Sequence, residues 1–208
     1  MAPTVSTTRP LVDGILPLPI FTDRLIIRSF RLSDLEAYHT LQTQPEAHEG
    51  YLELVSTDLS CTEDRLKKEL PPYESRLYLG IYLKKSDDSE GDLIGNGGMQ
   101  NLHSQKGWPN FGYQLKKEYW NKGYATEFAT AFMRFWWGLP RERTNLEITY
   151  SSVDFQDRSE VAERVYASAK LDNKASQRVL EKLGFEPFGY IDNKYGEHIC
   201  MENIFSVE

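Results

Sequence analysis

The residues best suited to chemistry lie in one stretch, 111–137. A short alternating run at 111–115 predicts a strand, and a polar turn with one glycine, Gly123, follows it. Apolar side chains then recur at helical spacing over 125–136. A turn that leads from a strand into a helix N-terminus suits anionic groups, because the first helical turn has free N–H donors and a partial positive charge. Gly123 would let a ligand approach the backbone without a side chain in the way.

The distribution of charge also favours a small anionic ligand. The 208-residue chain has a formal net charge of −7, which argues against a general nucleic-acid surface because such a surface needs a basic face. Two local basic clusters in an acidic chain suit a small anion better than a polyanion, although a solvated basic face is the common alternative. The clusters are Lys116, Lys117 and Lys122 around the turn, and Lys170, Lys174, Arg178 and Lys182 later in the chain.

The two cysteines, Cys61 and Cys200, are far apart and lack metal-ligand spacing. No metal site is therefore expected, and two free thiols in a reducing compartment is the simpler interpretation. The N-terminal residues contain no apolar core of signal-peptide length, and no apolar run is long enough to span a bilayer. We therefore expect a cytoplasmic protein with no membrane contact.

Strand and helix patterns interleave along the chain, which predicts an α/β fold with a mixed sheet. Four prolines in residues 1–20 predict an extended N-terminal arm, and residues 21–208 are expected to form a single domain. The polar segment 140–162 is long for a connection and predicts an insertion that covers a site, flanks a site or is mobile. Expected strands cover 23–30, 76–84, 93–102, 111–115, 164–171, 185–191 and 197–206, and expected helices cover 35–41, 62–70, 125–136 and 173–183.

Several sequence blocks resemble the Gcn5-related N-acetyltransferase (GNAT) superfamily. YWNKGYATEFATAFMRF resembles its acyl-CoA-binding signature, which has Gln or Arg, two residues, Gly, one residue, and then Gly or Ala. Gly123 and Ala125 match this pattern, whereas Trp120 departs from it at the first position. LDNKASQRVLEKLGF resembles the later strand–helix motif of the family. TDRLIIRSFRLSDLEAY resembles the opening of the subgroup that includes ribosomal-protein alanine N-acetyltransferases.

The resemblance implies the GNAT fold, a central mixed, mostly antiparallel twisted β-sheet that is splayed at the acyl-CoA site and flanked by α-helices. It also implies an enzyme that transfers the acetyl group of acetyl-CoA to a primary amine by direct attack in a ternary complex. The amine would belong to a protein N-terminus or to a small molecule. Acetyl-CoA would be a co-substrate, no metal or nucleic acid would be involved, and the protein would be a monomer or a homodimer.

The resemblance further implies a role for each matching position. Backbone N–H groups of the turn would bind the pyrophosphate of coenzyme A; they belong to Asn121, Lys122, Gly123, Tyr124, Ala125 and Thr126. The pantetheine arm would pair with the main chain of Gln114, Leu115 and Lys116, as an added strand does, and an N–H near Leu115 would stabilise the oxyanion. Asn173 would bind the pantetheine amide, cap its helix, or both. Ser176 would be either the general acid for the departing thiolate or an exposed helix serine.

The general base is the position at which the chain departs most from its relatives. They often place a Glu early in the strand before the turn, where this chain has Asn110, which cannot accept a proton. This departure favours an easily deprotonated substrate (an α-amine has a pKa of about 8, a lysine amine about 10.4), or a base outside the motif, or a weakened enzyme. His103, Glu46 and His48 are candidate substitutes, although each also fits an ordinary surface residue. Asn110 keeps a second function open, a non-catalytic acyl-CoA-binding sensor or docking module, while an unrelated α/β binding domain would require that CoA not bind.

Overall fold

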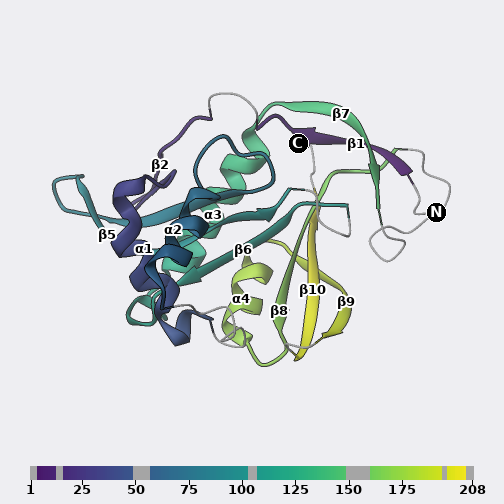
Figure 1. Cartoon of the computed structure of the whole chain (residues 1–208). Coiled ribbons are helices and arrows are strands. Elements are labelled where there is room, and N and C mark those ends of the chain that lie inside the picture. The colour runs from purple at the N-terminus through teal and green to yellow at the C-terminus, as the bar shows by residue number, and fades with distance from the viewer. Residues whose placement is uncertain are drawn as a thin grey trace.

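The computed structural model describes residues 4–12, 16–48, 57–102, 107–148, 160–193 and 196–204. In this part of the chain a large mixed sheet of eight strands forms the centre of the molecule (Figure 1). In spatial order its strands are β2 (Ile20–Phe21), β3 (Leu25–Arg28), β4 (Leu77–Lys84), β5 (Glu90–Asn101), β6 (Asn110–Leu115), β8 (Arg164–Lys170), β10 (Gly196–Ile204) and β9 (Glu186–Asn193). Every neighbouring pair is antiparallel except β6 and β8, which are parallel. The expected mixed, mostly antiparallel sheet is confirmed.

Two segments expected to lie outside the sheet pair with each other. Strand β1 (Thr4–Pro10), from the N-terminal arm, runs antiparallel to β7 (Arg141–Glu147), from the polar insertion. We call this pair the β1–β7 ribbon; in Figure 1 it extends along the upper right of the molecule. A small apolar cluster made of Val5, Trp108, Ile148 and Val161 packs at the ribbon. Residues 149–159 of the insertion lie outside the described residues.

Four α-helices and three short 3₁₀ turns occur in the described ranges. They are α1 (Leu35–Thr43), α2 (Leu59–Lys67), α3 (Tyr124–Gly138) and α4 (Lys174–Lys182), with η1 (Leu32–Asp34), η2 (Pro45–His48) and η4 (Lys117–Tyr119). Helix α2 begins earlier than the apolar pattern predicts, because Asp58 caps it by accepting the Ser60 N–H at 2.8 Å. None of the described helices combines the length and the apolar composition that crossing a membrane requires.

The helices bury both faces of the sheet, which explains its continuous apolar strands. In β3, Leu25 and Ile27 belong to the main core beneath α3 and α4, whereas Ile26 belongs to a second core beneath α1 and α2. Glycine in β5 allows α3 to pack closely: a Cβ at Gly97 would lie 2.5 Å from the ring of Phe128. The helix that carries the candidate site is therefore held at a fixed distance from the sheet.

Candidate active site

Strands β6 and β8 are neighbours in the sheet but separate soon after they meet. Asn110, the first residue of β6, is aligned with Tyr166, whose N–H donates to the Pro109 carbonyl at 3.0 Å. This is the only residue pair that aligns the two strands, both of which are described over their whole length. From residue 112 to 115 the inner edge of β6 has no aligned partner in β8, as the expected splay requires.

The backbone N–H of Leu115 points toward this unpaired edge. The Lys116 N–H donates to the Ile94 carbonyl of β5 at 2.9 Å, and successive strand residues direct their N–H groups to opposite sides. The Leu115 N–H is therefore directed away from β5 and toward β8. The Leu115 carbonyl accepts the indole N–H of Trp120 at 2.8 Å, so the side chain that departs from the family signature ties the turn to the end of β6.

The segment between β6 and α3, residues 116–123, leads into a helix start that has free backbone donors; we call it the β6–α3 turn. Asn121 and Gly123 have positive φ values of 58° and 83°. Such a value is common for glycine but unusual for asparagine. Gly123 is the N-cap of α3 and no side chain caps the helix there. The first backbone bond within the helix is from the Glu127 N–H to the Gly123 carbonyl at 3.0 Å, so the preceding N–H groups, 124–126, have no helical partner.

Arg24, at the start of β3, braces this turn, and no local sequence pattern identified it. Its Nε donates to Glu127 Oε2 at 2.7 Å, its Nη1 donates to the Lys122 carbonyl at 3.0 Å, and its guanidinium lies 4.4 Å from the centre of the Tyr124 ring. Glu127 also accepts the Thr22 hydroxyl at 2.6 Å. Burial raises the pKa of Glu127, but the Thr22 and Arg24 hydrogen bonds outweigh it and lower the pKa overall. The N-terminal strands thus fix the first turn of α3.

The three lysines of the basic cluster around the turn have different environments. Lys117 forms an ion pair with Glu46 of η2, with Nζ and Oε1 2.8 Å apart, and so holds η2 against the turn. Lys122 is exposed beside Gly123 at the helix N-terminus, where its charge adds to the partial positive charge of α3. Burial lowers the pKa of Lys116, although nearby acidic groups oppose the shift.

Asn173 and Ser176 lie at the start of α4, which follows β8. Asn173 caps the helix, because its Oδ1 accepts the Ser176 N–H at 3.0 Å. Gln177 donates to the carbonyls of Lys170 and Leu171 at 2.8 and 3.1 Å, and so fixes the helix to the end of β8. The Tyr113 hydroxyl of β6 donates to Ser176 Oγ at 3.4 Å, a long hydrogen bond that reaches across the unpaired edge.

Tyr113 therefore links the motif that contains β6 to the motif that contains α4. The sequence analysis did not predict this link. In the sequence it is an ordinary alternating residue of a strand, and its ring does pack against Phe111 and Phe128. Burial raises the pKa of Tyr113, although the Ser176 hydrogen bond opposes the shift. The phenol thus stays protonated and remains a donor to Ser176 at neutral and mildly alkaline pH.

The candidate bases have different environments. Glu46 is half-exposed, and its hydrogen bond with Lys117 lowers its pKa and occupies one of its carboxylate oxygens. His48 is only 7% exposed, on η2, which packs against β6, and its Nε2 has no hydrogen-bond partner in the described part of the chain. Burial and the charge of Arg65 lower the pKa of His48, so its imidazole is neutral at neutral pH. Asn110 lies at the junction of β6 and β8, and His103 falls outside the described residues.

Comparison with known proteins gives the family. A model of the acetyltransferase (GNAT) domain matches residues 24–186. The chain belongs to the GNAT acetyltransferase family. This GNAT protein is also 22% identical to the uncharacterized N-acetyltransferase p20 of Bacillus licheniformis. The matched region of 175 residues covers 83% of this chain and 84% of that protein.

Solved structures of GNAT proteins have the same fold. One is the ribosomal-protein-S5-alanine acetyltransferase from Vibrio fischeri, with a TM-score of 0.63, 16% identity, and coverage of 90% of this chain and 96% of that one. Another is RimL, the ribosomal L7/L12 α-N-protein acetyltransferase, solved in complex with coenzyme A, with a TM-score of 0.66, 16% identity, and coverage of 90% and 98%. The expected fold and family are confirmed, and the similar structures include ribosomal-protein acetyltransferases, as the resemblance implied.

Proposed function

We propose that this GNAT protein transfers the acetyl group of acetyl-CoA to a primary amine, at a protein N-terminus or on a small molecule, by direct attack in a ternary complex. One observation carries the proposal. Strands β6 and β8 align at a single residue pair, and the unpaired edge beyond it ends at a helix N-terminus without a side-chain cap. An extended pantetheine arm can pair with an unpaired strand edge, and a diphosphate can bind at the helix N-terminus that follows it.

The backbone would supply most of the binding. The N–H groups of residues 121–126 would hold the pyrophosphate, with Lys122 adding positive charge. The main chain of Gln114, Leu115 and Lys116 would pair with the pantetheine arm. The Leu115 N–H, directed toward β8, would donate to the thioester oxygen as the amine attacks and negative charge develops there.

Ser176 and Tyr113 would serve the leaving group. As the carbon–sulfur bond breaks, the Ser176 hydroxyl would donate a hydrogen bond to the sulfur and act as general acid, with a proton from solvent replacing the one that passes to the thiolate. Tyr113 already donates to Ser176 Oγ, so the hydroxyl hydrogen of Ser176 is left free to point elsewhere. Tyr113 is therefore a positioning residue in this scheme. Asn173 would keep its capping role and would hold Ser176 in place.

His48 is the base that its environment favours. Its imidazole is neutral and its Nε2 lacks a partner in the described residues, so this nitrogen has a lone pair available for a proton from the attacking amine. An α-amine suits a base of this strength better than a lysine amine does, because more of it is already neutral at neutral pH. We therefore favour an N-terminal α-amine or a small-molecule amine of similar pKa as the acceptor.

The experiment that tests the function has two stages. The full chain is first titrated with acetyl-CoA in a thermal-shift assay, where binding to the native state must raise the melting temperature by mass action. It is then mixed with acetyl-CoA and a panel of peptides, polyamines and amino acids, and free thiol is measured. We expect a raised melting temperature, and thiol release with peptides that have a free α-amine.

Two outcomes would contradict the proposal. An unchanged melting temperature at saturating acetyl-CoA would remove the cofactor assignment altogether. A raised melting temperature with no thiol release from any amine would favour the non-catalytic acyl-CoA-binding module that Asn110 keeps open. Capping the α-amine of a reactive peptide is the matched control, because it removes the nucleophile and leaves the rest of the peptide unchanged.

A further inference from the structure

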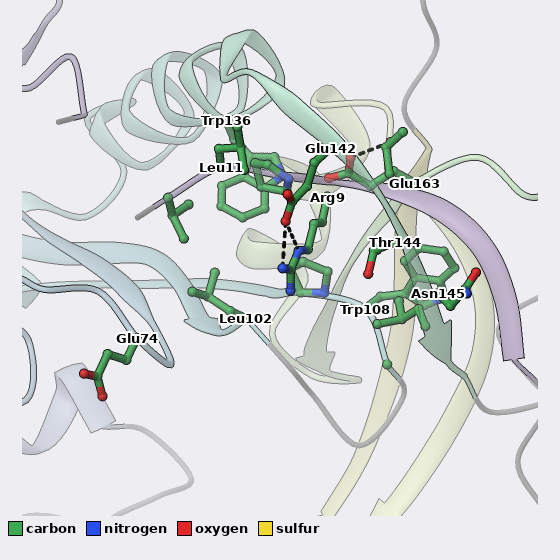
Figure 2. Close-up of a pocket in the computed structure, with 16 residues that line it drawn as sticks. Arg9, Leu11, Glu74, Leu102, Trp108, Trp136, Glu142, Thr144, Asn145 and Glu163 are labelled. Carbon is green, nitrogen blue, oxygen red and sulfur yellow. Dashed lines mark hydrogen bonds and ion pairs between the residues drawn. The ribbon is translucent and has the colours of Figure 1, made fainter. Parts of the chain in front are cut away.

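A cavity lies beneath the β1–β7 ribbon, at the opposite end of β6 from the β6–α3 turn (Figure 2). Its volume is about 260 Å³, and we call it the ribbon cavity. Residues 8–12, β7, the segment 107–109 before β6, and Glu163 before β8 contribute to its wall. A strand rises about 3.3 Å per residue, so the length of β6, about 17 Å, separates this cavity from Leu115.

Apolar side chains give the ribbon cavity room for a ring. Trp108 and Trp136 are both buried, and in Figure 2 they lie on opposite sides of the Arg9–Glu142 pair. Leu11 and Leu102 add aliphatic surface. Since an apolar cavity of about 150 Å³ can hold benzene, the ribbon cavity is large enough for one aromatic ring that carries a polar substituent.

Two polar atoms of the lining residues lack partners in the described part of the chain. They are Oε1 of Glu163, which is 2% exposed, and Nε1 of Trp136, which is fully buried. The other carboxylate oxygen of Glu163, Oε2, accepts the Thr8 hydroxyl at 3.0 Å and Arg141 Nε at 3.3 Å. Buried polar groups are normally paired, so one acceptor and one donor in these residues call for a ligand with the complementary groups.

Apart from Glu74, the charged side chains around the ribbon cavity form two ion pairs. Arg9 is paired with Glu142 at 2.7 Å, and Arg141 is paired with Glu163 at 3.3 Å. Glu74 also contributes to the wall, but its carboxylate points away from the others in Figure 2. A charged ligand would therefore add an uncompensated charge beside buried groups, which is unfavourable. An uncharged ligand fits better.

We propose that the ribbon cavity is a second ligand site, which binds a small uncharged molecule made of an apolar ring and a primary or secondary amide. The ring packs between Trp108 and Trp136. The amide N–H donates to Glu163 Oε1, and the amide carbonyl accepts the Trp136 indole N–H. This site is separate from the one proposed for acetyl-CoA, and its occupant is held in part by β1 and β7, so binding fastens the ribbon to the main sheet.

Benzamide is the probe, added to the full chain labelled with ¹⁵N. The chain has four tryptophans, and each indole N–H gives a resonance that a Trp→Phe variant assigns. Benzamide is expected to shift the Trp108 and Trp136 resonances in a saturable way, with a Kd on the order of 1–10 mM for so small a ligand. Trp120, which belongs to the β6–α3 turn, is expected to stay unchanged with benzamide.

Matched probes and variants make the proposal falsifiable. N,N-dimethylbenzamide has the same ring and carbonyl but no N–H, and is expected to bind about fivefold more weakly. The Glu163→Gln substitution should lower the affinity for benzamide by a similar factor. Leu11→Trp, at a side chain that is 40% exposed, should fill the entrance without disturbing the fold and abolish the shifts.

Two results would overturn the assignment. Unmoved Trp108 and Trp136 resonances at the solubility limit of benzamide would show that the ribbon cavity takes no such ligand. Equal affinity for benzamide and N,N-dimethylbenzamide would show that the unpartnered atoms play no part in binding. Neither result bears on acetyl-CoA, whose binding is followed separately through Trp120 and the melting temperature.

Discussion

The two sites that we propose lie at opposite ends of β6 and are built in different ways. At the Leu115 end the useful groups belong to the backbone: an unpaired strand edge and the first N–H groups of α3. At the Asn110 end, in the ribbon cavity, they are side chains from distant parts of the chain, chiefly Trp108, Trp136 and Glu163. A backbone site tolerates most side-chain changes and depends on conformation, whereas a side-chain site depends on residue identity. The predictions below test this contrast, from the largest expected effect to the smallest.

Gly123→Glu should have the largest effect. It places bulk and negative charge at a helix N-terminus and imposes a side chain on a residue with φ of 83°. The affinity for acetyl-CoA, measured by calorimetry, is expected to fall about 100-fold or more. Gly196→Glu is the control, because φ there is 104° and a Cβ would meet nothing within 4 Å. Equal losses in the two variants would mean that backbone strain, and not the site, explains the result.

The two Arg–Glu pairs at opposite ends of the molecule should respond differently. Arg24→Ala removes the brace of the β6–α3 turn and is expected to raise the KM for acetyl-CoA about tenfold. Arg9→Ala breaks the exposed Arg9–Glu142 pair and should leave that KM unchanged, with a loss in unfolding free energy of about 1 kcal/mol or less. Steady-state kinetics and urea unfolding of both variants measure this. An equal rise of this KM in the Arg24→Ala and Arg9→Ala variants would contradict the proposed difference between the two ends of β6.

Tyr113→Phe should lower kcat by about three- to tenfold, with little change in the KM for acetyl-CoA, because the hydroxyl orients Ser176 and touches no part of the cofactor in our scheme. Ser176→Ala should give a similar loss. If the two residues act together, the double variant should be no slower than the slower single variant. Multiplied losses in the double variant would instead mean that the hydroxyls act independently.

Stability should depend on pH with opposite sign at the two ends. Burial lowers the pKa of His48 below 6.5, so just below pH 6.5 the unfolded chain binds more protons and stability rises with pH. Burial outweighs Arg141 and raises the pKa of Glu163 above 4.5, so from pH 4.5 upward the folded chain binds more protons and stability falls as pH rises. His48→Gln and Glu163→Gln should each abolish one of these slopes in urea unfolding at stepped pH. Unchanged slopes would contradict the burial of these groups.

Sequence patterns predicted the local features of the backbone site well. The strand at 111–115, the helix that follows Gly123 and the cap at Asn173 each depend on residues close together in the chain, where periodicity and capping preferences operate. The divergence of β6 and β8 came from the family resemblance, because no local pattern tells a strand to leave its neighbour.

Features that depend on distant residues were not predictable in the same way. Thr4 lies opposite Glu147 in the ribbon, and Arg24 reaches Glu127 across 103 positions of sequence. The alternating polarity of β7 suits a strand but does not identify its partner. Tyr113 illustrates the same limit, since a strand tyrosine looks like core until the fold places Ser176 beside it.

The single aligned residue pair between β6 and β8 has a mechanical consequence. It divides the large sheet into a five-stranded part, β2 to β6, and a three-stranded part, β8, β10 and β9, joined at Asn110 and Tyr166. Elsewhere along that seam the two parts are joined by packing among α3, α4 and the inner residues of β8, and by single side-chain hydrogen bonds such as Tyr113–Ser176 and Trp137–Asn203. A rotation of the three-stranded part about the Asn110–Tyr166 pair would change the width of the gap between β6 and β8 without breaking another ladder of hydrogen bonds.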